Sequence, residues 1–301
     1  MNTQHSELGR RMRPSPANAL RKLLVILEMI KFEHTIFALP FALSSALVAA
    51  RGIPSLPTLG WIVLAMVGAR SAAMAFNRIA DSKLDAANPR TKARALPAGL
   101  VSISSAWALT IISAALLVFA AKMLNPLAFA LSPVALIVVL GYSYSKRFTT
   151  LSHLWLGLSL GIAPVGAWIA VKGEIGFPSM VLSAAVILWT AGFDIIYSLQ
   201  DLEFDRKTGL FSLPARIGPD RALLVSRLFH AGMVALLVWF GLLTGRGPIY
   251  YAGVAMVAIC LIYEQSIVSP RDLSRVNAAF FTLNGCVSLA MLGFVAADVL
   301  L

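Results

Sequence analysis

Two acidic clusters hold the side chains of this 301-residue sequence whose types and spacing could do chemistry. In the first, NRIADSKLD, Asn77, Asp81 and Asp85 are spaced four residues apart. If the apolar helix before them continues, one helical face carries an amide and two carboxylates. The basic residues Arg90 and Arg94 follow a few positions later. Carboxylates beside cations suit a site where a divalent metal binds a diphosphate.

The second cluster repeats this arrangement at the end of another apolar run, FDIIYSLQDLEFDRKTG. Asp194, Asp201 and Asp205 are spaced by seven and four residues, which predicts that they also share one helical face. A single DxxxD pair more often marks the solvated end of a helix. Two pairs, each ending an apolar segment and each followed by basic residues, favour a single shared site.

The composition indicates an all-α polytopic membrane protein. The chain is 58% hydrophobic and only 13% charged, whereas a soluble domain is roughly 45–50% apolar and about 25% charged. A net charge of +11 would suggest a nucleic-acid partner in a soluble protein. In a membrane protein the positive-inside bias explains it, so no nucleic-acid partner is expected. Cys260 and Cys286 lie in apolar segments without metal-ligand spacing, which argues against a disulfide framework.

We predict a basic cytoplasmic tail over residues 1–22 and one transmembrane domain over residues 23–301. Nine apolar stretches approach the ~20 residues that a helix needs to cross a bilayer. These predicted spans cover residues 23–50, 58–76, 102–121, 126–144, 153–171, 179–199, 222–243, 249–268 and 276–300.

Most of the 25 Lys and Arg residues fall in the tail and in the connections after the even-numbered spans. We predict a multi-pass protein of the inner (plasma) membrane, and the positive-inside rule predicts its orientation. Its N-terminus and both acidic clusters would face the cytoplasm.

Two of the charged residues inside predicted spans lie in register with the acidic clusters. Arg70 comes seven residues before Asn77, and Asp194 seven before Asp201. A charge at this depth is costly and normally faces a polar cavity or a partner. The alternative for the arginine is a long side chain that extends to the membrane surface.

Further basic side chains flank the first and fourth spans. Lys146 and Arg147 either anchor the fourth span at the interface or hold diphosphate oxygens. Lys31 and His34, at the entry to the first crossing, either bind an anionic substrate group or take part in a structural Glu-His contact. His153 and His230 are assigned no role.

The ligand that these features favour combines a diphosphate head with a long apolar tail. The sequence contains neither GxxxxGK[ST] nor GxGxxG after a strand, which argues against a nucleotide. A polyprenyl diphosphate fits both the acidic clusters and the lipid setting. Stabilising the leaving diphosphate would let the allylic C1–O bond ionise, and the carbocation would then attack an electron-rich acceptor.

The sequence resembles the UbiA-type superfamily of intramembrane aromatic prenyltransferases. The resemblance rests on NRIADSKLD, DLEFD, RTKARALPAG and YSYSKRFT. It implies a nine-helix bundle with a central cavity, Mg²⁺ as cofactor, and a polyprenyl diphosphate donor. The metal ligands that it implies are Asp81, Asp85, Asp201 and Asp205. The implied diphosphate contacts are Asn77, Arg90, Arg94, Lys146 and Lys83. Arg147 is added because it lies beside Lys146 at the end of the fourth span.

The resemblance leaves the aromatic acid acceptor open. Arg78 and Ala95 depart from the family's motifs, and the first span, KFEHTIFALPFAL, differs from the form that 4-hydroxybenzoate enzymes tend to carry. The acceptor is 4-hydroxybenzoate, as in ubiquinone synthesis, or 1,4-dihydroxy-6-naphthoate, as in menaquinone synthesis through futalosine. Arg70 or Lys31, with His34 nearby, would pair with its carboxylate. Asp194 would position or deprotonate the ring.

Two other function classes compete with this interpretation. A CDP-alcohol phosphotransferase would carry a DGxxAR element, which is absent, and much closer acid pairs. A secondary transporter could use Arg70 and Asp194 as an intramembrane relay. Against a transporter, the acids are expected at one face of the membrane only.

Overall fold

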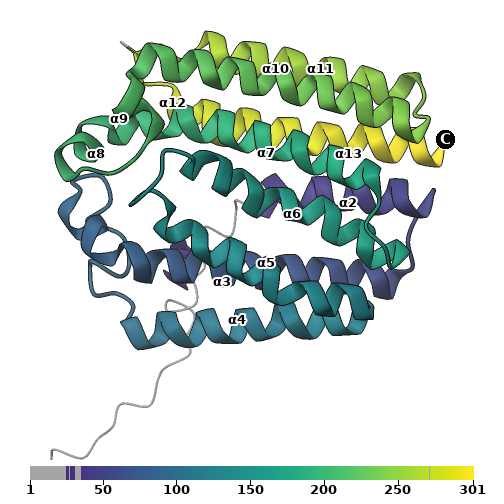
Figure 1. Ribbon diagram of the computed structural model, residues 1–301, viewed down its shortest axis with the longest axis horizontal. Coiled ribbons are helices and arrows are strands. Elements are labelled where there is room, and N and C mark those ends of the chain that lie inside the picture. Colours follow the sequence, from purple (N-terminus) through teal and green to yellow (C-terminus); the bar gives the residue numbers. More distant parts are fainter. Residues whose placement is uncertain (1–24, 27, 31–34, 271) are drawn as a thin grey trace, which may run out of the picture.

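A computed structural model describes residues 25–26, 28–30, 35–270 and 272–301 of the chain. In this part the structure is an all-α bundle whose long helices lie side by side along one axis (Figure 1). The long helices are α2 (Thr35–Ala50), α3 (Leu56–Ala87), α4 (Ile103–Leu124), α5 (Pro126–Ser145), α6 (Ser152–Lys172), α7 (Phe177–Ser198), α10 (Pro219–Thr244), α11 (Pro248–Ser266) and α13 (Asn284–Leu300). Short elements join them: η2 (Leu199–Asp201), α8 (Leu202–Thr208), α9 (Leu213–Ile217), α12 (Val276–Ala278) and η3 (Ala279–Leu283).

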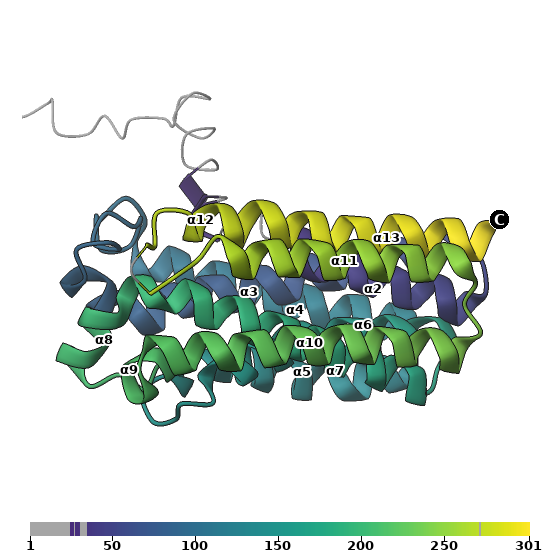
Figure 2. The same cartoon turned by 90° about the horizontal axis from the view of Figure 1, so that it is seen from above.

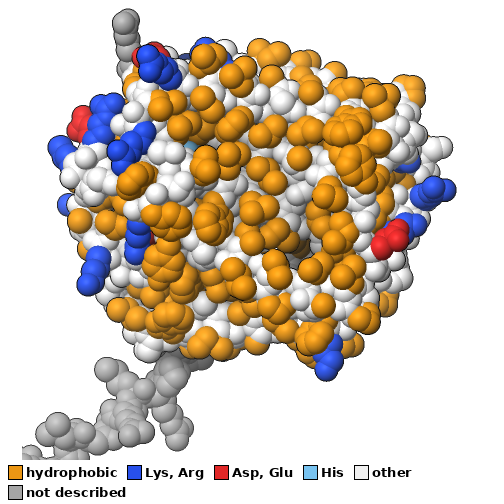
Figure 3. Space-filling view, viewed as in Figure 1, with side chains coloured by type: hydrophobic (Ala, Val, Ile, Leu, Met, Phe, Trp, Pro, Cys, Tyr) orange, Lys and Arg blue, Asp and Glu red, His pale blue; other side chains and the backbone are white. Residues whose placement is uncertain are grey.

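The polytopic, all-α prediction is confirmed. Within the described residues, eight helices are long and apolar enough to cross a membrane, and the shorter apolar helix Phe37–Ala50 accounts for the first predicted span. Their outward faces are rich in apolar side chains, as Figure 3 shows for one side of the molecule. The protein is therefore an integral membrane protein. The predicted tail over residues 1–22 lies outside the described residues.

Local sequence sets several helix ends. Ser102 caps α4 by accepting the Ser105 N–H, at 3.1 Å. Asn125 accepts the Ala128 N–H at the start of α5 and donates to the carbonyl of Ile169 at 2.8 Å, which joins α5 to the end of α6. Gly173 then ends α6 in the left-handed conformation, with φ of 72°.

Helix α3 runs well beyond the predicted second span. Its 32 residues continue to Ala87, a length of about 48 Å, whereas the apolar core of a bilayer is about 30 Å thick. The final turns therefore reach past the apolar layer. They carry Asn77, Asp81 and Asp85 on the face that the spacing predicted.

The second acidic cluster is less regular than the sequence predicted. Helix α7 ends at Ser198, and the 3₁₀ turn η2 separates it from α8. Asp194, Asp201 and Asp205 thus do not share the face of one continuous α-helix, because a 3₁₀ turn has three residues rather than 3.6. The prediction of one helical face is wrong in this detail.

The last span contains a buried polar network. Its π-helix η3 leads into α13, and the Asn284 side chain donates to the carbonyls of Ala279 and Phe280 at 3.1 and 3.3 Å. It also donates to Glu264 at 2.9 Å and accepts the indole N–H of Trp189 at 2.6 Å. Because π-helical turns leave carbonyls poorly paired, Asn284 holds this irregular segment in place.

One end of the bundle gathers the polar elements. The short helices α8, α9 and α12 and the loop that follows α3 all lie there, at the end opposite the C-terminus (Figures 1 and 2). Most of the basic side chains visible in Figure 3 also lie at this end. The fold thus brings the two acidic clusters to the same end of the molecule.

Close packing of α6 on α7 gives a stability prediction. A Cβ on Gly157 would lie 2.4 Å from the carbonyl oxygen of Ile187. We expect Gly157→Ala to lower the free energy of unfolding by about 1–3 kcal/mol, since the helices must separate. Thermal unfolding in detergent measures this. Gly166→Ala on the same helix is the matched control, because its Cβ would meet nothing within 4 Å. Equal unfolding midpoints for the two variants would contradict the prediction.

Candidate active site

A polar cavity of about 260 Å³ opens at the end of the bundle where the acidic clusters meet. Side chains from α3, the loop after it, α5, α6, α7, η2 and α8 line it. Among the described residues its charges balance, with five carboxylates and five basic groups. These are Asp81, Asp85, Asp194, Asp201 and Asp205, and Arg70, Arg78, Arg90, Arg94 and Lys146.

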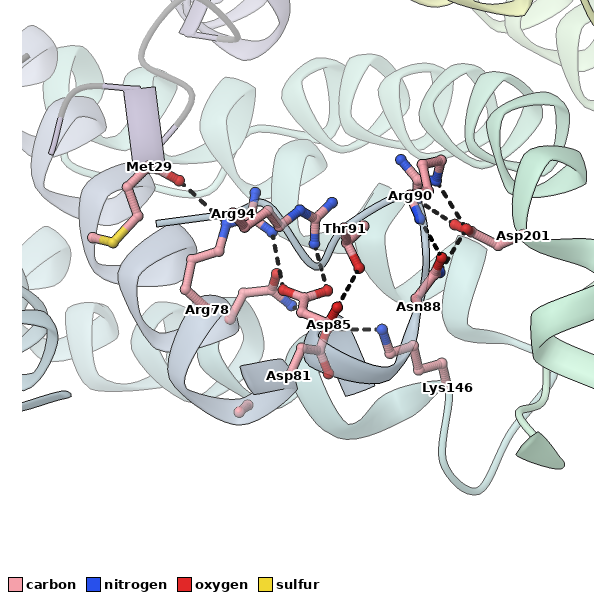
Figure 4. Close-up of polar contacts among 12 residues, drawn as sticks. Met29, Arg78, Asp81, Asp85, Asn88, Arg90, Thr91, Arg94, Lys146 and Asp201 are labelled. Atoms are coloured by element: carbon pink, nitrogen blue, oxygen red, sulfur yellow. Dashed lines mark hydrogen bonds and ion pairs between the residues drawn. The ribbon is translucent and has the colours of Figure 1, made fainter. Parts of the chain in front are cut away.

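Asp81 is the best-paired carboxylate of the first cluster. It is only 2% exposed, and the Lys146 ammonium donates to its Oδ2 at 2.7 Å (Figure 4). Arg147 lies 3.2 Å from Oδ1, and Asn77 donates to Oδ2 from the preceding turn. The basic end of α5 is thus held against the acidic end of α3.

Asp85 lies one turn further along α3 and is 5% exposed. Arg94 donates to its Oδ1 at 2.7 Å, while its buried Oδ2 has no hydrogen bond from any described residue and lies 4.0 Å from Arg78. Arg78 itself donates to the carbonyl of Met29, which ties the segment before α2 to the cavity (Figure 4). Asp85 therefore keeps one oxygen available for a further ligand.

The loop after α3 joins the two clusters. The Arg90 guanidinium makes two hydrogen bonds to the carboxylate of Asp201, one of them at 2.8 Å, and Asn88 donates to the same carboxylate at 2.9 Å. Arg90 also lies over the ring of Tyr197, 5.3 Å from its centroid. Burial opposes the charge on Arg90, but the bonded carboxylate outweighs it and raises the pKa of the guanidinium above its ordinary value.

Asp194 and Asp205 complete the second cluster. Asp194 Oδ2 lies 2.7 Å from His153 Nδ1. Asp205 is 8% exposed, and no basic group among the described residues lies within ion-pair distance of it. All three acids of this cluster line the cavity despite the break in the helix.

A second, apolar cavity of about 400 Å³ continues from the polar one into the bundle. Helices α3 to α6 supply most of its lining. The two cavities share a boundary formed by Arg70, Met74, Asn77, Tyr142, Leu156 and Leu160. A ligand with a charged head and an apolar tail can therefore occupy both cavities at once.

Some predicted site residues lie elsewhere. Lys83 is exposed and does not line the cavity, because it projects from another face of α3. Arg147 reaches Asp81 without lining the cavity and lies over the ring of Tyr144, 4.9 Å from its centroid. Lys31 and His34 lie outside the described residues.

Sequence reasoning missed two polar groups of the site. Asn88 follows the first cluster and also accepts the Arg90 N–H at 2.9 Å, an Asx turn that an Asn two residues before the Arg could have suggested. His153 has no such local signal, since its partner Asp194 lies on another helix.

The donor set fits Mg²⁺ bound together with a diphosphate. Four of the carboxylates that line the cavity offer hard oxygen ligands: those of Asp81 and Asp85 from α3, and those of Asp201 and Asp205 from η2 and α8. In the described part of the chain no three acidic, histidine or cysteine side chains are close enough to hold an ion by themselves. Mg²⁺ usually takes one or two carboxylates and completes its shell with substrate phosphates and water, so it needs no closed protein cage.

The fold and the paired cavities define an intramembrane protein whose site can hold a ligand with an anionic head and an apolar tail. The chain belongs to the UbiA prenyltransferase family, whose model matches residues 38–285. It is a polyprenyltransferase of the type that curated relatives represent. The resemblance stated from the motifs is thereby confirmed.

Relatives cover most of the chain. The 4-hydroxybenzoate octaprenyltransferase of Vibrio parahaemolyticus is 33% identical over 83% of this chain and 88% of its own length. That of Shewanella loihica is 31% identical over 90% and 96%.

Solved structures share the fold. The apo structure of a UbiA homologue from Aeropyrum pernix K1 matches with a TM-score of 0.81 and 39% identity, over 89% of this chain and 98% of that one. A UbiA homologue from Archaeoglobus fulgidus bound to GPP and Mg²⁺ matches with a TM-score of 0.74 at 20% identity, over 91% of this chain and 99% of that one.

Proposed function

We propose that this protein transfers a polyprenyl group from a polyprenyl diphosphate to 4-hydroxybenzoate, with Mg²⁺ as cofactor, in ubiquinone synthesis. The continuity of the charged cavity with the apolar one carries the donor part of the proposal. The relatives named 4-hydroxybenzoate octaprenyltransferase support the acceptor. The basic residues at the cavity end of the bundle support a cytoplasmic site in the inner membrane.

The cavity's cations would hold the donor. Arg90, Arg94 and Lys146 are already placed by hydrogen bonds to carboxylates, so they can turn to diphosphate oxygens without large movements. Asn77 faces the same space. When bound, Mg²⁺ would neutralise the negative charge that builds up on the leaving diphosphate.

The reaction exchanges one bond for another. The allylic C1–O bond breaks, and its electron pair leaves with the diphosphate. A ring carbon of the acceptor forms a C–C bond to C1, and the ring loses a proton. Asp194, which lines the polar cavity, would receive that proton or hold the acceptor's hydroxyl, and Arg70, at the boundary of the cavities, would hold its carboxylate.

Purified protein in detergent tests the proposal directly. The assay offers Mg²⁺, a polyprenyl diphosphate, and either 4-hydroxybenzoate or 1,4-dihydroxy-6-naphthoate. We expect prenylated 4-hydroxybenzoate and one diphosphate per product. The departure of KFEHTIFALPFAL from the pattern of 4-hydroxybenzoate enzymes favours the naphthoate as second candidate. Product from the naphthoate alone would overturn the proposed acceptor. If neither acid gave product or released diphosphate, the proposed prenyl transfer would be overturned. A secondary transporter would then be among the remaining candidates.

Arg70→Ala separates the binding of the acceptor from that of the donor. We expect the acceptor KM to rise about tenfold or more, because a charged hydrogen bond to its carboxylate is lost, and the donor KM to change little. Steady-state kinetics with each substrate varied in turn measures this. Arg227→Ala is the matched control, since Arg227 is the other arginine inside a predicted span but is exposed and lies outside both cavities. Equal rises in both KM values would contradict the assignment.

A further inference from the structure

His153 occupies a buried position where two parts of the site meet. It lies at the start of α6, is 4% exposed and lines the polar cavity. One ring nitrogen, Nδ1, lies 2.7 Å from Asp194 Oδ2 on α7. The other, Nε2, accepts the backbone N–H of Leu213 at 3.2 Å, where α9 begins. The imidazole thus connects a cavity carboxylate to the segment between α8 and α9.

These two contacts fix the position of the ring proton. A nitrogen that accepts an N–H carries no hydrogen of its own, so in the neutral ring the proton is on Nδ1. His153 therefore donates a hydrogen bond to Asp194 without transferring its proton to that carboxylate. The second oxygen of Asp194, Oδ1, has no hydrogen bond within the described structure, and the carboxylate remains 17% exposed to the cavity.

The segment on the other side of His153 is also held at the site. The Phe211 N–H donates to the carbonyl of Lys146 at 2.7 Å, and Leu210 and Ser212 line the cavity. The ring of His153 is therefore fixed from two directions, by α7 and by the segment that leads into α9. A side chain held in this way has little freedom to leave Asp194.

We propose that His153 is the positioning residue for Asp194: it holds Oδ2 by the Nδ1–H bond, so that Oδ1 faces the aromatic acceptor and receives its proton. The proton moves from the acceptor to Oδ1, while His153 keeps its own proton on Nδ1 throughout. This inference depends on the role proposed above for Asp194. The competing interpretation is that His153 only braces the segment before α9.

Two substitutions separate these roles, because each preserves one nitrogen. Asn places an amide nitrogen at the position of Nδ1, so His153→Asn keeps a donor to Asp194 and loses the acceptor for Leu213. Gln places its amide group near the position of Nε2, so His153→Gln keeps an acceptor for Leu213 and loses the donor to Asp194. Both are neutral and polar, which limits the disturbance of the buried site.

We expect His153→Gln to lower kcat for prenyl transfer about ten- to a hundredfold with little change in the donor KM, as the loss of a hydrogen bond to a charged group implies. His153→Asn should stay within about threefold of the wild type, since the Nδ1-type donor is retained. Unfolding midpoints in detergent show whether each variant is folded. A larger loss for His153→Asn than for His153→Gln, or equal effects of the two, would overturn the inference.

Asp194→Asn, assayed beside them, keeps the two proposals distinguishable. If Asp194→Asn is impaired and His153→Gln is not, the inference about His153 is wrong and the role of Asp194 stands. If Asp194→Asn is as active as the wild type, the role proposed for Asp194 is wrong, and the inference about His153 is overturned with it.

Discussion

Replacing Asp81 by Ala should lower kcat/KM for prenyl transfer by a factor on the order of 10²–10³, the usual cost of removing one group that stabilises developing charge. Asp81 is buried, and it holds both Lys146 and Arg147 at hydrogen-bond distance. Its loss would remove a proposed metal ligand and would also release the cations beside the diphosphate. Diphosphate release and product formation, measured in parallel, should fall together.

Two further variants sharpen this experiment. Asp81→Asn keeps the size and the hydrogen-bonding oxygen but removes the charge, so a similar loss of activity would attribute the effect to charge. Glu203→Ala is the matched control, because Glu203 is an exposed acid of α8 that does not line the cavity. Activity of Asp81→Ala within a few-fold of that of Glu203→Ala would refute the assignment.

Removing divalent metal should have an effect at least as large. We expect a chelator to lower prenyl transfer by about two orders of magnitude or more, because the metal's charge stabilisation of the leaving group is lost. Adding Mg²⁺ in excess of the chelator should restore the rate. One cavity is lined by Asp81, Asp85, Asp201 and Asp205, but no three of the described acidic, histidine or cysteine groups can hold an ion without further ligands.

The small number of protein ligands at the site also predicts how tightly the metal binds. With an incomplete protein shell, Mg²⁺ should bind weakly to the free enzyme and more tightly in the presence of diphosphate. Calorimetric titration of Mg²⁺ with and without inorganic diphosphate tests this, and Asp201→Asn should weaken the binding. An unchanged reaction rate in excess chelator would exclude a required divalent ion.

Hydropathy and spacing predicted the scaffold well. Membrane helices need about 20 apolar residues, and this requirement leaves a signal in the sequence at eight of the predicted spans and a shorter apolar helix at the first, within the described residues. The i, i+4 spacing of Asn77, Asp81 and Asp85 was also sufficient, because α3 continues without interruption to Ala87. Local periodicity determines both features.

Features set by tertiary contacts could not be predicted in this way. The 3₁₀ turn after Ser198 contains neither Gly nor Pro, so nothing in the local sequence marks the end of α7. His153 meets Asp194 only because α6 packs on α7, and isolated histidines give no periodic signal. The exposure of Lys83 likewise depends on which face of α3 is buried, which spacing from Asp81 alone does not determine.

Asn284, which is buried in the core, stabilises the π-helix that forms part of the wall of the polar cavity. Phe280 and Phe281 belong to η3 and line the polar cavity, and Phe280 packs against Phe193. A π-helical turn contains one residue more than an α-helical turn, so deleting one residue here would turn the preceding segment by about 100° relative to α13. The aromatic wall would then face away from the substrate although every phenylalanine remained. Insertions and deletions in η3 should thus be tolerated less well than conservative substitutions of its side chains.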